Sequence, residues 1–475
     1  MTSLPIMDMT QQELSKALGS GLVSCSNVAE AAIERITAIN PQINAIIRFD
    51  AENVRAQACA LDARREAGDN SPWLGIPVTV KDNIWIANRP VSNGSLLFKD
   101  FIAPVDSIAV ARLRKAGALI LGSANCSEFA CKGVTTNSLH GETRNPWDLA
   151  LTPGGSSGGA AAATSAGLNC LALGTDAGGS VRRPASHTGL IGMKPSSGMI
   201  PHAGGFDEPV YGHSVIGTLT RSVADAWAAL VLLGHHDPAD PQSPPTRAEL
   251  RSLSQPLQRS KIAWSPRLGL GFAVNPDVAA LCEAAVQALR NNGHDVVEID
   301  PPWPEGASEE ALMPLQLAGL AAIYGERYRA GEWQVDPDIA RQIEAGLTLS
   351  GRDVAEALEL RKALYAALAK LFQTYDFLVC PTTPAAAWPL NQLGPKQIEG
   401  RDASPRAHAV FTPIFNHCNI PACSVPCGLN EIGLPVGLQI AGPMFNDDRI
   451  LALAALVEAH TEHDFTRVKQ LEPKL

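Results

Sequence analysis

Two serines and one lysine stand in surroundings that suit covalent chemistry. Ser156 lies within Gly-Gly-Ser-Ser-Gly-Gly, Ser180 follows 24 positions later at the end of Asp-Ala-Gly-Gly-Ser, and Lys81 ends a short apolar run. A serine hydroxyl is hardly ionised at neutral pH, so it needs an adjacent base to become a nucleophile. A buried, neutral lysine can be that base. The three residues therefore indicate a serine that forms and breaks an acyl intermediate without histidine.

The backbone before Ser180 can stabilise the negative charge that such a reaction develops. Consecutive glycines allow neighbouring N–H groups to point at one spot. An oxyanion hole needs this arrangement of donors. We expect the hole to be formed by the N–H groups of Ala177, Gly178, Gly179 and Ser180.

Other interpretations of the glycine-serine segment fit less well. The spacing Gly-x-Ser-x-Gly around Ser156 matches the nucleophile elbow of α/β-hydrolases, but that elbow follows a strand. Here Pro153 and residues 144–148 have the composition of a loop. A phosphate-binding loop would have Lys-Ser or Lys-Thr after the glycines, and none follows. His187 and His213 are the nearest candidates for a histidine base, and neither belongs to a recognisable triad motif.

Short strands and helices alternate around these residues. This alternation predicts an α/β architecture with a mixed, largely parallel β-sheet covered by helices on both faces. We expect strands at 76–80, 119–121, 169–174, 377–380 and 436–440, and helices at 26–39, from Ser157 onwards, and at 447–461.

The middle of the chain has a different pattern. Apolar residues recur there at helical spacing, which predicts helices at 276–292, 308–331, 337–348 and 351–375. We therefore predict one domain over 1–475, with an α/β core at 60–260 and 376–475 and a mostly helical insertion at 265–375.

Composition narrows the function classes. The chain has 475 residues, of which 45% are hydrophobic and 18% charged, so it folds and buries a large core. Its net charge of −10 argues against a nucleic-acid surface. Neither a basic signal-type start nor an apolar run of membrane length is seen, so we expect a cytoplasmic protein without a membrane contact. Cys418, Cys423 and Cys427 near His417 indicate buried thiols rather than a metal site.

Taken together, these motifs resemble the amidase signature family. The two glycine-serine blocks match its pattern in composition and spacing, as does a lysine 75 positions before Ser156. Further matches are Gly-x-Thr-Arg-Asn-Pro at 141–146, Gly-x-Lys-Pro at 192–195, Cys-Pro-Thr-Thr-Pro at 380–384 and Gly-Leu-Pro-Val-Gly-Leu-Gln at 433–439. The resemblance covers most of the chain, from about residue 44 to residue 443.

The resemblance implies a role for each catalytic residue. Ser180 matches the nucleophile, Ser156 the bridging serine after a cis peptide bond from Gly155, and Lys81 the general base. No metal and no organic cofactor is implied. Ala177 stands where many members carry Thr or Ile, which leaves its backbone N–H unchanged.

The resemblance also indicates where a substrate would bind. Pocket walls in this family come from variable segments, here 126–137, 200–213, 310–350 and 385–410. Within or near these we expect Thr136, Asn137 and Arg183 to contact substrate. Arg182 is expected to brace the loop under the nucleophile. For Arg183 two interpretations stay open: pairing with a neighbouring acid, or binding a substrate carboxylate.

We therefore predict an amidohydrolase that cleaves the C–N bond of a small or medium carboxamide, with aryl amides, ureas, carbamates and esters left open. An alternative within the resemblance is the glutaminase subunit of a tRNA-dependent amidotransferase. A remote alternative is a non-catalytic binding protein on the same fold. The expected partner is a small amide, and whether the protein forms a homodimer stays open.

Overall fold

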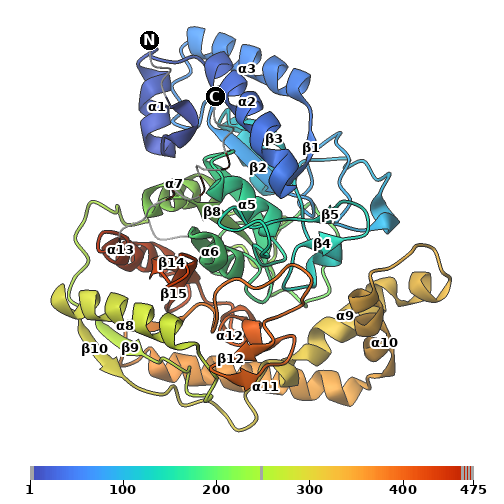
Figure 1. Ribbon diagram of the computed structural model, residues 1–475, viewed down its shortest axis with the longest axis vertical. Helices are drawn as coiled ribbons and strands as arrows, with labels where there is room; N and C mark the ends of the chain where they lie inside the picture. Colours follow the sequence, from blue (N-terminus) through green and yellow to red (C-terminus); the bar gives the residue numbers. More distant parts are fainter. Residues whose placement is uncertain (1–4, 246–249, 462–464, 466–467, 469–470, 472–475) are drawn as a thin grey trace.

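The computed structural model describes residues 5–245, 250–461, 465, 468 and 471. One large sheet runs through it (Figure 1). In sequence order its strands are β1 (Ile46–Phe49), β2 (Pro77–Lys81), β3 (Leu119–Ala124), β6 (Leu171–Asp176), β7 (Ile191–Lys194), β8 (Val215–Thr220), β9 (Lys261–Trp264), β10 (Asp295–Glu298), β11 (Phe377–Pro381), β14 (Ala422–Leu429) and β15 (Pro435–Ala441). Two short hairpins lie outside it, β4 (Thr136–Asn137) with β5 (Gly141–Glu142), and β12 (Gln397–Ile398) with β13 (Arg401–Asp402).

The predicted α/β class with a mixed sheet is confirmed. The strand order is β1-β3-β2-β6-β8-β7-β14-β15-β11-β9-β10. Parallel pairs join β3, β2 and β6 near one end, and β11, β9 and β10 at the other. Between these groups every neighbouring pair is antiparallel. The short link between β14 and β15 explains part of this, because a tight hairpin can only join antiparallel strands.

Helices cover both faces of the sheet, as predicted. Every residue of β15 is buried, and its successive side chains point to opposite faces, so both faces must be covered. The helices are α1 (Gln11–Gly19), α2 (Cys25–Ile43), α3 (Ala51–Glu66), α4 (Ile108–Lys115), α5 (Gly158–Ser165), α6 (Arg182–Thr188), α7 (Val223–Leu233), α8 (Pro276–Asn291), α9 (Glu309–Arg329), α10 (Pro337–Thr348), α11 (Gly351–Leu371), α12 (Pro413–His417) and α13 (Asp447–Glu458).

The helical middle of the chain starts later than the sequence suggested. Helices α9, α10 and α11 lie together at one side of the molecule (Figure 1). However, β9 pairs with β11 and β10 pairs with β9 in the large sheet, and α8 packs on β10 and β11. Residues 261–298 are thus part of the α/β core. Strands of four residues carry too little periodicity to separate them from the helical stretch around them.

A small apolar cluster attaches α9 and α10 to the core. Phe129, from the short 3-10 helix at 128–130, stacks on Tyr324 of α9 with ring centroids 3.9 Å apart. Ile339 and Ile343 of α10 belong to the same cluster. The helical layer is therefore held over the residues just after β3.

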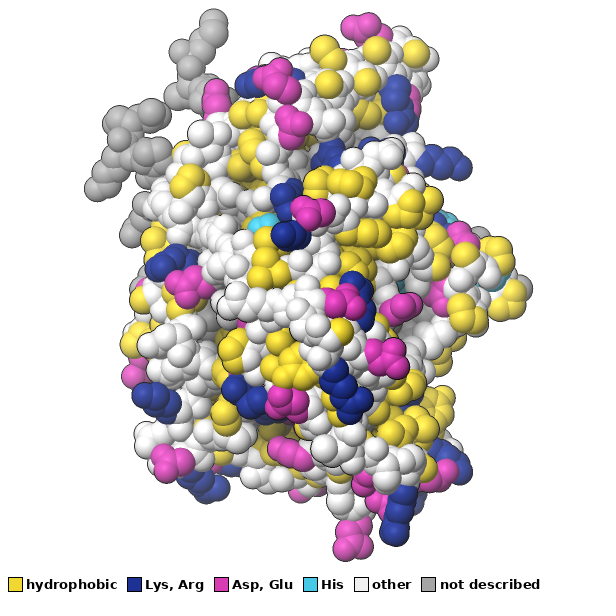
Figure 2. Space-filling view, turned by 90° about the vertical axis from the view of Figure 1, so that its right-hand side faces the viewer, with side chains coloured by type: hydrophobic (Ala, Val, Ile, Leu, Met, Phe, Trp, Pro, Cys, Tyr) yellow, Lys and Arg dark blue, Asp and Glu magenta, His cyan; other side chains and the backbone are white. Residues whose placement is uncertain are grey.

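The surface carries charges of both signs. On the face shown in Figure 2, basic and acidic side chains lie interspersed with apolar ones. Within the described ranges, none of the helices combines the length and the apolar character that a bilayer crossing needs.

Candidate active site

Lys81 lies at the end of β2 and is fully buried. Its Nζ is 2.8 Å from Ser156 Oγ and 2.9 Å from Thr175 Oγ1, at the end of the neighbouring strand β6. Thr175 Oγ1 also accepts a hydrogen bond from Asn83 Nδ2 at 2.9 Å. Burial lowers the pKa of Lys81 to about 8, because an ammonium group is poorly solvated there. A lysine in this state can accept a proton near neutral pH.

Ser156 is held in a tight loop before α5. The Gly155–Ser156 peptide bond is cis, as the resemblance implied. Thr135 Oγ1 donates to the Gly154 carbonyl and accepts from the Gly158 N–H, both at 2.9 Å. A Cβ on Gly155 would lie 2.7 Å from the backbone of Val134, so only glycine fits there. These contacts fix the hydroxyl of Ser156 beside Lys81.

Ser180 ends the loop between β6 and α6. The Ser157 N–H donates to its carbonyl at 3.2 Å, which joins the two glycine-serine loops. Ser180 borders two cavities, and one of them is also lined by Ser156. Among the hydrogen bonds of the described residues, none joins the hydroxyls of Ser156 and Ser180. Such catalytic contacts are often long without substrate and shorten in the reacting complex.

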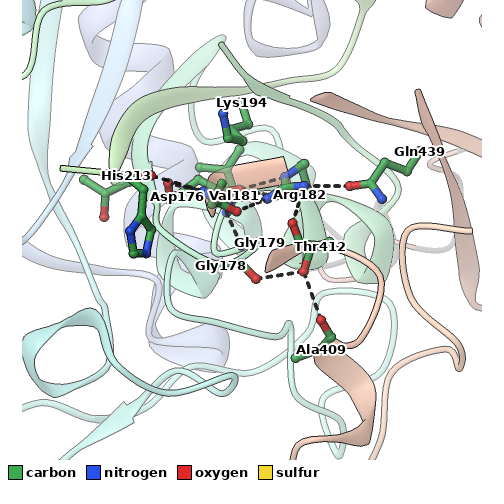
Figure 3. A network of polar contacts seen from close by, with 12 residues as sticks. Asp176, Gly178, Gly179, Val181, Arg182, Lys194, His213, Ala409, Thr412 and Gln439 are labelled. Carbon is green, nitrogen blue, oxygen red and sulfur yellow. Dashed lines mark hydrogen bonds and ion pairs between the residues drawn. The ribbon is translucent and has the colours of Figure 1, made fainter. Parts of the chain in front are cut away.

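A buried ion pair supports the Ser180 loop (Figure 3). Arg182 Nη2 and Nε donate to the Asp176 carboxylate at 2.9 and 3.1 Å, and both side chains are fully buried. Arg182 Nη1 also donates to Gln439 Oε1 at 2.7 Å and to the Thr412 carbonyl at 3.0 Å. Burial by itself would raise the pKa of Asp176, but the charge and hydrogen bonds of Arg182 hold it well below its usual range. The bracing role expected for Arg182 agrees with these contacts.

The backbone donors before Ser180 differ from the expected set of four. The Gly179 N–H donates to Asp176 Oδ1 at 2.7 Å, so it points at the buried Asp176–Arg182 ion pair, which we call the brace. Ala177, Gly178 and Ser180 remain as candidate donors. Gly179 has a φ of +111°, and a Cβ there would lie 2.1 Å from Thr412 Oγ1. Glycine is needed at position 179, as the sequence pattern suggested. The reason is the positive φ and the close contact with Thr412, and not an N–H group directed at an oxyanion.

Two cavities meet at Ser180. The main cavity, about 50 Å³, is lined by Ala177, Gly178, Ser180, Arg183, His213, Glu309, Arg406 and His417. The side cavity, about 30 Å³, is lined by Ser156, Thr175, Ser180, Asn83, Asn93, Phe206, Asp207 and Glu208. An outer cavity of about 300 Å³ shares Lys132, Met313, Arg406 and His408 with the main one. Each of the four segments that the resemblance indicated contributes to these walls.

Arg183 lies in the main cavity, whereas Thr136 and Asn137 do not line any of the three cavities. Asn137 donates through Nδ2 to Asn125 Oδ1 at 2.8 Å and to the Cys126 carbonyl at 2.7 Å. Its amide is thus committed to holding the turn after β3. Both residues lie in β4, which pairs with β5, and the cavity walls lend no support to the expectation that they contact substrate, which stays a prediction.

Arg183 is buried, and within the described part of the chain its Nε has no hydrogen-bond partner. The neighbouring acid, Glu309, pairs with Arg406 instead. Burial lowers the pKa of Arg183 to about 10. The side chain therefore brings a positive charge to the wall of the cavity beside Ser180.

Sequence reasoning missed several residues around the site. Thr175 and Asn83 hold the lysine, although Asn83 stands only two positions after Lys81 and Thr175 directly precedes Asp176. His213 and His417 lie with their ring centroids 4.2 Å apart, tilted relative to each other, and line the main cavity. Burial lowers the pKa of both imidazoles well below the usual value, so they are neutral. Neither histidine belongs to a sequence motif, and only the fold brings His213 and His417 together.

Among the described residues, no group of three or more His, Cys, Asp or Glu side chains is placed to hold a metal ion. Cys418, Cys423 and Cys427 are buried, as expected for structural thiols, and burial raises the pKa of Cys418 to about 12.

Similarity to known proteins extends over nearly the whole chain. The amidase family model matches residues 27–451. An acylamidase from Rhodococcus erythropolis is 38% identical, with 97% of each chain covered. One of the subunits of the glutamyl-tRNA(Gln) amidotransferase from Symbiobacterium thermophilum is 33% identical, with 97% of this chain and 98% of the relative covered. The crystal structure of a bacterial aryl acylamidase of the amidase signature family superposes with a TM-score of 0.90 at 26% identity, covering 99% and 100% of the two chains.

Proposed function

Since the chain belongs to the amidase signature family and is a hydrolase of amide C–N bonds, we propose that it works through an acyl intermediate on Ser180, with Ser156 and Lys81 as its proton relay. The observation that carries this proposal is the buried hydrogen bond of 2.8 Å between Lys81 Nζ and Ser156 Oγ, at the wall of a cavity that Ser180 also lines.

The first half-reaction forms the acyl-enzyme. Ser180 Oγ attacks the amide carbonyl carbon while its proton passes to Ser156 and the proton of Ser156 passes to Lys81. The carbonyl oxygen becomes an oxyanion held by the N–H groups of Ala177, Gly178 and Ser180. Collapse of this intermediate breaks the C–N bond. The relay returns the proton to the leaving nitrogen, and the amine departs neutral.

The second half-reaction releases the acid. A water attacks the ester on Ser180 and gives its proton to the same relay. The C–O bond to Ser180 then breaks, and the serine takes the proton back. Each residue ends in its starting state, so no external base or reductant is consumed.

Thr175 supports the proton direction within this relay. Its Oγ1 accepts from Lys81 and from Asn83, which occupies both acceptor positions of the hydroxyl. In neutral Lys81, one N–H is thereby directed at Thr175, and the nitrogen lone pair is left for the proton of Ser156.

For the acyl part of the substrate, we propose that Arg183 binds an acceptor group such as a carboxylate. A guanidinium that lines the same cavity as the nucleophile, with its Nε unpaired among the described residues, favours a charge-assisted hydrogen bond. The test is a hydrolysis screen over aryl amides, aliphatic amides, ureas, carbamates and esters, with and without an acyl-side carboxylate, using Ser180→Ala as the blank. Arg183→Ala should raise KM about 10- to 100-fold for the carboxylate-bearing amides only. Equal losses on neutral and acidic amides would make Arg183 structural.

The glutaminase interpretation stays the second candidate, because the amidotransferase relative matches this chain end to end at 33% identity. A non-catalytic protein is disfavoured by intact catalytic positions. A cytoplasmic location and a homodimer stay predictions, and light scattering of the purified protein would test the second.

A further inference from the structure

The side cavity next to Ser180 is bordered by hydrogen-bond acceptors. Glu208 and Asp207 bring carboxylates to its wall, on the loop before β8. A carboxylate at neutral pH can only accept hydrogen bonds. His202 Nε2 lies 3.6 Å from Glu208 Oε1, which is an ion pair only when the imidazole is protonated and is beyond a good hydrogen bond. The acidic pair is therefore open to a donor in the cavity.

Two buried amides add acceptors to the same wall. Asn83 and Asn93 both line the side cavity, and each is more than nine-tenths buried. The Oδ1 atoms of both have no hydrogen-bond partner among the described residues. Buried polar atoms are paired in nearly all native structures. Two unpaired carbonyl oxygens beside two carboxylates thus call for a ligand group that is rich in donors and positively charged.

The loop that carries the acids is held rigidly. Phe206 packs against Phe98 with ring centroids 4.6 Å apart, and against Trp85 edge-on at 5.7 Å. Phe206 also lines the side cavity itself. An aromatic face beside carboxylates suits an organic cation, since cations are attracted to the ring as well as to the acids.

The proton relay decides which part of a substrate enters this cavity. Ser156 lines the side cavity, and in the proposed mechanism it hands the proton to the leaving nitrogen. The amine part of the amide must therefore depart on this side. Arg183 lies in the other cavity, on the acyl side. Opposite charges thus flank Ser180.

We propose that the side cavity is a subsite for a protonated amino group on the leaving amine, so that the preferred substrates are mono-acylated diamines. This inference rests on the proposed acyl-serine mechanism for its orientation. An ammonium group offers three donors and no acceptor, which matches a wall made of Glu208, Asn83 and Asn93. A volume of about 30 Å³ holds only a small head group, so a short spacer fits best.

The test compares N-acetylethylenediamine with N-propylacetamide, which has a methyl group in place of the ammonium. Binding is measured by calorimetry on the full chain carrying Ser180→Ala, so that no turnover is needed. We expect the ammonium compound to bind at least about tenfold more tightly, as charged hydrogen bonds predict. Adding Glu208→Gln should reduce this preference to near unity, whereas Glu310→Gln, an exposed acid on α9, should leave it intact.

Asp207→Asn serves as a second variant, because Asp207 is exposed and we expect its replacement to leave the fold undisturbed. This variant should partially lower the preference for the ammonium compound over N-propylacetamide. Equal binding of the two compounds, binding of neither, or a preference that survives both Glu208→Gln and Asp207→Asn would overturn the inference. Failure of the acyl-serine mechanism would show separately, as activity that persists in Ser180→Ala protein.

Discussion

Lys81 can accept a proton only after it has lost its own. Burial lowers the pKa of Lys81 to about 8, so the neutral, active form becomes dominant as the pH rises through that value. We predict that kcat/KM rises between about pH 6 and pH 9 with an apparent pKa near that of Lys81. A pH profile on a neutral amide measures this. An optimum on the acidic side of neutrality would contradict a neutral-lysine base.

In the proposed relay Ser156 and Lys81 act as one unit, joined by their hydrogen bond of 2.8 Å. Lys81→Met and Ser156→Ala should each lower kcat by about 10³-fold, and the double variant should lose little more, since groups in one relay are non-additive. Single-turnover rates of the three variants test this. Lys362→Met, on the exposed side of α11, is the matched control and should keep full activity. If the loss of kcat in the double variant equalled the product of the two single losses, Lys81 and Ser156 would be working independently.

At the scale of elements, the Ser180 loop depends on the brace between β6 and α6. Asp176→Asn would leave the Arg182 charge buried without its partner. We expect it to cost about 3 kcal/mol or more of unfolding free energy and to lower kcat, because the Gly179 N–H loses a charged acceptor. Urea denaturation and steady-state kinetics measure the two effects.

The control for the brace is an ion pair at the surface. Lys362 and Glu359 form an exposed pair on α11, and Glu359→Gln should change stability by less than about 1 kcal/mol. If Asp176→Asn were equally mild, the buried pair would not be what holds the nucleophile loop.

Long helices and the loops with glycine-serine motifs were predictable from sequence, because their patterns are local. Helix α10 matches its predicted range, and α8 and α9 match within a few residues at each end. Strands such as β7 and β9 were missed because they have only four residues, nearly all of them buried, and show no periodicity to reveal them. The direction of the Gly179 N–H depends on Asp176, and the wall formed by Asn83 and Glu208 depends on segments far apart in the chain. Neither follows from a motif.

At the scale of the whole molecule, the open point is whether this chain alone can hydrolyse amides or needs partner subunits. The proposed catalytic groups and the Asp176–Arg182 ion pair all belong to this chain, and we predict that the purified protein hydrolyses amides without partner subunits. Co-expression and co-purification with candidate amidotransferase subunits, together with an amide screen that includes glutamine, measures this. Activity that appears only with partners, and chiefly on glutamine, would favour the glutaminase interpretation.

The most direct test of the central claim is to identify the residue that becomes acylated. A fluorophosphonate or sulfonyl fluoride should react with the wild-type protein and abolish its activity, and peptide mass spectrometry should find the label on Ser180 alone. Ser180→Ala protein should remain unlabelled and inactive, with an unchanged melting temperature, since the substitution removes one hydroxyl from a loop that is braced through Asp176 and Arg182. Label on another serine, or amide hydrolysis that persists in Ser180→Ala, would contradict the account.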